Sequence, residues 1–89
     1  MVKEDIRDSI SEISESALVF DNPAFDLSII GVTTDDRVVY SLSSMIKELS
    51  EEDNISVEEA EDFIYYNTIR ALDYISAEQR PIIIEVENL

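Results

Sequence analysis

The sequence has no cysteine and no histidine, and only six basic residues accompany its 21 acids. Without cysteine the chain can form no disulfide, thiolate metal site or cysteine nucleophile. Without histidine it has no imidazole to act as a general base or a metal ligand. These absences exclude much of the usual catalytic and metal-binding chemistry. We therefore expect no enzyme activity, no cofactor and no metal site.

The shortage of basic residues gives the 89-residue chain a formal net charge of −15. The negative side chains repel one another within a fold, but the net charge favours solubility and attracts basic partners. Nucleic acids and anionic membranes bind basic surfaces, so we expect direct binding to neither. The hydrophobic fraction of 45% is sufficient for folding. We treat residues 1–89 as a single acidic domain with a small core, to which the helix over residues 1–15 can be peripheral.

Long hydrophobic runs are also missing. No window approaches the roughly 18 apolar residues of a membrane-spanning helix. The N-terminal residues MVKEDIRD contain no apolar segment of the kind found in a signal peptide. We therefore expect a cytoplasmic protein.

The clearest element is a helix predicted over Ser56–Leu72. Ser56 and Glu59 have the spacing of a capping box, acids crowd the positive N-terminal end, and Arg70 lies near the negative C-terminal end. One helical stripe is apolar, and we expect it to face the core. Its members are Val57, Ala60, Phe63, Ile64 and Ala71.

Two further helices are predicted from apolar periodicity. Residues 3–15 carry isoleucines at spacings of three and four, and this helix could pack on the domain or mediate dimerisation. Ser41 can cap a helix over Leu42–Ser50. We expect Glu51–Asn54 to form a polar connector and Asp73–Arg80 to form a loop.

Four segments predict strands because they are apolar or β-branched and are bounded by turn residues. They are Ala17–Phe20, Leu27–Thr33, Arg37–Tyr40 and Pro81–Glu87. The turn residues Thr34–Asp36 favour a hairpin between the second and third of these strands. Gly31 lies inside a strand, which indicates a bulge or a close backbone approach. Three consecutive isoleucines after Pro81 predict burial on both faces of the last strand.

The elements follow the order α-β-β-β-α-α-β, which is typical of an α+β domain. We expect a small, mainly antiparallel sheet of about four strands, packed by about three helices.

Acidic residues are concentrated between Glu48 and Asp62, a stretch that contains eight acids and no base. Such a run can be a solvated surface, or it can imitate the spaced charge of nucleic acid and occupy a Lys/Arg groove. The candidate partner-binding residues are Glu48, Glu51, Glu52, Asp53, Glu58, Glu59, Glu61 and Asp62, with Tyr65 as an anchor. The run does not have the alternating ligands and central glycine of an EF-hand loop. No nucleophile or phosphate-binding loop accompanies its carboxylate pairs.

Asn67 and Thr68 interrupt the apolar stripe of the predicted third helix. Buried polar groups normally find partners, so this pair could bond neighbouring backbone and tie the helix to the Asp21–Asp26 loop. The alternative is that the pair forms a recognition spot together with Arg70.

Three segments of the chain resemble a group of small acidic proteins from Firmicutes genomes and their phages. They are DNPAFDLSIIGVTTDDRVVY (Asp21–Tyr40), EDFIYYNTIRAL (Glu61–Leu72) and PIII (Pro81–Ile84). The resemblance covers about three-quarters of the chain and omits the N-terminal helix. Its most specific part is the NTIRAL run, which a proline-tyrosine pair follows in that group, where this chain has Asp73-Tyr74. The resemblance implies a phage or mobile-element setting and no particular activity.

The leading hypothesis is a non-catalytic interaction protein that blocks the basic groove of a host nucleic-acid-binding defence protein or nuclease, as an anti-CRISPR-like inhibitor in the host cytoplasm. The alternative is a housekeeping adaptor or homodimer. Its interface would be apolar, formed by the first helix with Ile6, Ile10 and Ile13 or by a sheet edge.

Overall fold

The computed structural model of the chain describes residues 3–13 and 17–85. Its elements, in chain order, are α1 (Lys3–Ile13), the 3-10 helix η1 (Pro23–Ser28), β1 (Ile29–Val32), β2 (Val38–Ser41), α2 (Leu42–Asp53), α3 (Val57–Phe63), the π-helix η2 (Ile64–Ile69), the 3-10 helix η3 (Leu72–Tyr74) and β3 (Ile82–Ile84). The α+β class is confirmed. The prediction of about four strands and about three helices is only roughly matched, because the described residues form a three-stranded sheet and about four helices.

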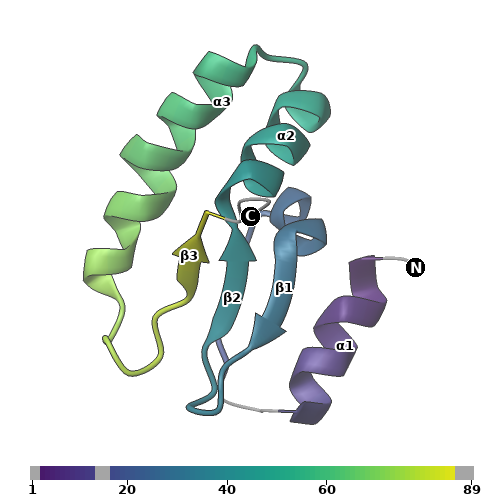
Figure 1. Ribbon diagram of the computed structural model, residues 1–89, viewed down its shortest axis with the longest axis vertical. Helices are drawn as coiled ribbons and strands as arrows, with labels where there is room; N and C mark the ends of the chain where they lie inside the picture. Colours follow the sequence, from purple (N-terminus) through teal and green to yellow (C-terminus); the bar gives the residue numbers. More distant parts are fainter. Residues whose placement is uncertain (1–2, 14–16, 86–89) are drawn as a thin grey trace.

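The sheet is mixed, with the order β1-β2-β3 (Figure 1). β1 and β2 form the predicted antiparallel hairpin. β3 pairs with β2 in the parallel direction, so a mainly antiparallel sheet is not what forms. The cause is the long connection through α2 and α3, because a parallel pair needs a crossover of a dozen or more residues.

The hairpin contains the predicted turn and a bulge. Asp36 has the positive φ of 67° that the turn requires, and the Thr33 N–H donates to the Arg37 carbonyl at 2.8 Å. The strand register shifts between Ile29 and Gly31, which confirms the expected bulge. A Cβ atom at Gly31 would meet nothing within 4 Å, so the alternative of a close backbone approach is wrong.

The segment Ala17–Phe20 has no regular secondary structure and is not a strand. Its partner is a side chain, because the Phe20 N–H donates to the Tyr40 hydroxyl at 3.0 Å. The Phe20 ring also lies 4.8 Å from the Tyr40 ring, measured between centroids. The apolar residues that suggested a strand therefore contribute to the core without entering the sheet. Similarly, the predicted strand Leu27–Thr33 is shortened at its start by η1, which Asn22 caps by accepting from the Ala24 N–H at 3.0 Å.

α2 begins as predicted, with the Ser41 hydroxyl accepting from the Ser44 N–H at 3.4 Å. The helix continues to Asp53, so the prediction that Glu51–Asn54 is a connector is wrong for its first three residues. Asn54 ends the helix in the left-handed conformation, with φ 53° and ψ 48°. Acidic residues have adequate helix propensity, and the left-handed cap, rather than the charge, ends the helix.

The third helical segment runs from Val57 to Tyr74, but its α geometry is interrupted after Phe63 by η2. Ala60 and Ile64 are buried as predicted, whereas Val57, Phe63 and Ala71 are exposed. The i→i+5 hydrogen bonding of η2 rotates Ala71, which follows it, relative to the α spacing that the predicted stripe assumed. Val57 and Phe63 precede η2, so this rotation does not account for their exposure. The predicted loop from Asp73 begins only after η3.

β3 is shorter than the predicted strand Pro81–Glu87, whose last two residues lie outside the described part. Its isoleucines are half-buried or exposed, so the expected burial on both faces is wrong. β3 is an edge strand with β2 as its one neighbouring strand in the described sheet, so part of its surface stays exposed. The loop before it is held by two arginines: Arg37 Nε donates to the Arg80 carbonyl at 2.7 Å, and Arg80 Nη2 donates to the Ile75 carbonyl at 3.1 Å.

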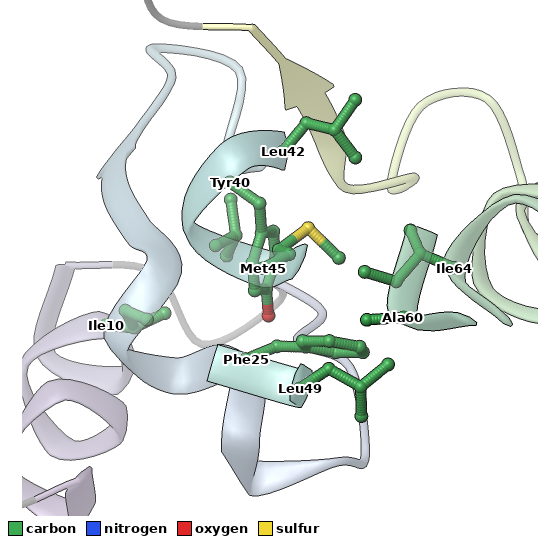
Figure 2. Packing of buried hydrophobic residues seen from close by; sticks show 9 residues of the cluster. Ile10, Phe25, Tyr40, Leu42, Met45, Leu49, Ala60 and Ile64 are labelled. Atoms are coloured by element: carbon green, nitrogen blue, oxygen red, sulfur yellow. The ribbon is translucent and has the colours of Figure 1, made fainter. Parts of the chain in front are cut away.

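The core lies between η1, β2, α2 and α3 (Figure 2). Its buried residues are Ile10, Phe25, Val38, Tyr40, Leu42, Met45, Leu49, Ala60 and Ile64. Figure 2 shows Met45 extending toward Ile64, with Phe25 beside Leu49. α1 is confirmed as a helix over Lys3–Ile13, and it joins this core through buried Ile10, with Ile6 packed against the cluster.

The hydrogen bond between Phe20 and Tyr40 predicts a stability difference between two conservative variants. Tyr40→Phe removes the acceptor of a partly buried N–H, and we expect a loss of about 1 kcal/mol in the free energy of unfolding, measured by urea denaturation. Tyr74→Phe makes the same chemical change on an exposed side chain and should leave stability unchanged. Equal stabilities for the two variants would contradict this role for Tyr40.

Candidate functional site

The predicted acidic residues lie at the connected end of the helical hairpin formed by α2 and α3 (Figure 1). We call this end the acidic tip, defined by Glu48, Glu51, Glu52, Asp53, Glu58, Glu59, Glu61 and Asp62. The two helices pack against each other, and three residues, 54–56, connect them. The fold therefore gathers charges from two helices at one end of the hairpin.

Local interactions fix the turn of the acidic tip. The Asn54 and Ile55 N–H groups both donate to the Ser50 carbonyl, and the Ser50 hydroxyl donates to the Ile55 carbonyl at 2.6 Å. Ser56 then caps α3 by accepting from the Glu59 N–H at 3.1 Å. Ile55 packs against the core. The positions of the charged helix ends are therefore set by short-range bonds and one apolar contact.

All the side chains of the acidic tip are exposed except Glu48, which is half-buried. Glu58, Glu61 and Asp62 have spacings of three and four, which places them on one face of α3. Tyr65 is exposed and lies in the first turn of η2, directly beyond that face. The positive N-terminal end of α3 stabilises the carboxylates of Glu58 and Glu59. Glu61 and Asp62 lie beyond the first turn of α3, so the helix dipole does not stabilise them, and the neighbouring carboxylates repel one another.

A pocket of about 420 Å³ is lined from Phe63 onward, the residue that follows Asp62 of the acidic tip, and the sequence did not predict it. One wall consists of residues 18–22 and Phe25. The opposite wall is the helical face that presents Phe63, Asn67, Thr68 and Ala71, and Ile75 and Pro81 complete the lining. The pocket is mainly apolar, and it opens at Leu18 and Phe63, which are 39% and 44% exposed.

The π geometry of η2 positions the polar residues of this pocket. Asn67 Nδ2 donates to the Phe63 carbonyl at 3.1 Å, which confirms the expectation that this residue bonds neighbouring backbone. Thr68 is buried in the wall, whereas Arg70 is exposed and does not line the pocket. Asn67 and Thr68 line the same pocket as Asp21 and Asn22 of the predicted loop. The sequence signal was the polar interruption of the stripe. Its geometry depends on a π-helix, which periodicity does not predict.

No group of three acidic, histidine or cysteine side chains that could hold a metal ion occurs within the described ranges 3–13 and 17–85. Over the same residues, no helix is sufficiently long and apolar to cross a bilayer. No protein-family model, curated protein or solved structure matches the chain. The resemblance to acidic phage proteins thus stays a prediction.

The left-handed cap at Asn54 predicts an order of stability for variants of the acidic tip. A residue with a Cβ atom, other than asparagine or aspartate, is disfavoured in this conformation by about 1 kcal/mol. We expect Asn54→Ala to unfold at a lower urea concentration than the parent chain. Asn54→Gly should be more stable than the alanine variant by about 1 kcal/mol or more in the free energy of unfolding. If alanine and glycine gave the same midpoint, the backbone conformation at the tip would be different from the one described.

Proposed function

We propose that this chain is a non-catalytic interaction protein of phage or mobile-element origin. Its acidic tip occupies the Lys/Arg groove of a host nucleic-acid-binding protein, such as a CRISPR effector or another defence nuclease, and thereby inhibits it. The supporting observation is that the eight clustered acids come from two helices but share one end of a fixed hairpin.

The charge density of α3 supports this proposal. α3 carries four carboxylates in a length of about 6 Å along its axis, at a rise of about 1.5 Å per residue. They belong to Glu58, Glu59, Glu61 and Asp62. Duplex DNA carries one negative charge per about 1.7 Å of its axis. The two densities are therefore similar, and a groove that follows phosphates could accept the helix. The net charge of −15 would also attract a basic partner over long range.

A homodimer or adaptor is the second candidate, and the sheet edges favour it more than α1 does. Ile10 of α1 is buried in the core of its own chain, so this face is already covered. β1 and β3 each pair with a strand on one side only within the described sheet, and Ile30 and Ile84 are exposed on them. A sheet-edge interface would be insensitive to salt, because salt does not screen apolar burial as it screens charge.

The proposal is tested by affinity capture from a host lysate with stepwise salt elution. We expect a nucleic-acid-binding protein that is released at moderate salt and displaced by added DNA or RNA. Replacing Glu58, Glu59, Glu61 and Asp62 by lysine should weaken this capture by about tenfold or more, because attraction becomes repulsion.

The matched control reverses four exposed acids away from the tip, Asp8, Glu12, Glu78 and Glu85, and it changes the net charge by the same amount. This control should retain capture. Intact binding in the tip variant would contradict the assignment of the surface. A partner that remains bound at high salt would favour the sheet-edge interface instead.

A further inference from the structure

We propose that the pocket lined from Phe63 onward receives a bulky apolar side chain from a partner segment in which that residue is flanked by lysine or arginine. This inference rests on the proposed function, since the flanking basic residues would bind the acidic surface. It adds an apolar anchor to a contact that would otherwise depend on charge alone.

The size and lining of the pocket suit an aromatic or large aliphatic side chain. Its volume of about 420 Å³ is within the range of roughly 300–1,000 Å³ that is typical of ligand pockets. The Phe20 ring in one wall is held by Tyr40 and lies edge-on to Phe25, with 6.0 Å between the centroids. This wall is formed before any partner arrives, so little ordering is needed on binding.

The polar groups of the pocket favour a donor or a cation. Asp21 contributes an exposed carboxylate at the rim. The amide nitrogen of Asn67 already donates to the Phe63 carbonyl, so its side chain offers an oxygen acceptor. Arg70 is outside the lining, and Asp62 directly precedes the rim residue Phe63. Arg80 lies against the lining residue Ile75, where it donates to the backbone carbonyl. The charge is therefore complementary to a basic segment at Asp21 and Phe63 and not around the whole lining.

The surroundings of the opening indicate a protein partner rather than a small molecule. The helical segment that contributes Phe63 to the lining also exposes Tyr66 (68%) and Tyr74 (92%), which lie outside the lining. Tyrosine is enriched at binding hot spots, where a central anchor is enclosed by further contacts. Glu58 and Phe63 are separated by about 8 Å of helix rise, so a short segment can span the acids and the pocket.

The chain contains no tryptophan, so the emission of a tryptophan in a peptide reports its burial without background. The probes are two nonapeptides with four lysines on each side of a central tryptophan or serine. Calorimetry should show that the tryptophan peptide binds about tenfold more tightly, and its emission should shift to the blue.

Ala71→Phe fills the pocket from an exposed position, and Ala77→Phe is the matched control on an exposed residue outside the lining. The preference for tryptophan should disappear in the first variant and persist in the second. If Ala71→Phe affects folding, the preference for tryptophan can instead be compared between two serine variants. Phe63→Ser changes a residue that lines the pocket, and Tyr66→Ser changes one that does not.

Three results would overturn the proposal, and they separate its parts. Equal affinity for the two peptides would contradict the pocket and leave the acidic surface intact. Binding of neither peptide would contradict the acidic surface itself, and with it the inference that depends on it. Tryptamine binding as tightly as the tryptophan peptide would show a small-molecule site, because the flanking lysines would then contribute nothing.

Discussion

The arrangement of the chain depends on the contacts that the buried Tyr40 side chain makes with Phe20. Tyr40 belongs to β2, the central strand, and its hydroxyl accepts from the Phe20 N–H at 3.0 Å. This bond replaces the ladder that a strand at Ala17–Phe20 would have needed, and ring contacts connect the segment to Phe25. The same contact fixes one wall of the pocket, whereas the packing of α2 and α3 over the core fixes the acidic tip and the other wall.

Elements governed by local chemistry could be predicted from the sequence. Ser41 and Ser56 act as caps, Thr34–Asp36 forms the hairpin turn, and Gly31 lies at a bulge. In each case the residue acts on the backbone within a few positions, so no knowledge of the remaining fold was required.

Features that depend on distant partners could not be predicted. Whether Ala17–Phe20 pairs as a strand depends on Tyr40, and the direction of β3 depends on the path of the crossover. The change to π geometry at Ile64 has no sequence rule comparable to a cap, and it rotates Ala71, which follows η2, away from the predicted stripe. The acids of the candidate site were found because they are contiguous in sequence. The pocket was missed because its walls come from segments that are 38 or more residues apart.

Under the proposed function, the acidic tip and the pocket would supply complementary kinds of binding energy. Charge accelerates encounter and suits many basic surfaces, whereas a shaped apolar pocket distinguishes one surface from another. Their shared boundary lies at Asp62 and Phe63, which are adjacent in the chain and both exposed. A protein with both features could bind a phosphate-binding groove and still discriminate among the many host proteins that have one.

The most direct test of the acidic tip as the binding surface is a map of backbone amide shifts in the isotopically labelled chain during titration with the lysine-flanked tryptophan peptide. We expect the changes to concentrate in residues 48–62 and around the pocket, with α1 and the outer edges of β1 and β3 unaffected. Changes confined to α1 or the sheet edges, with the tip unperturbed, would contradict the account.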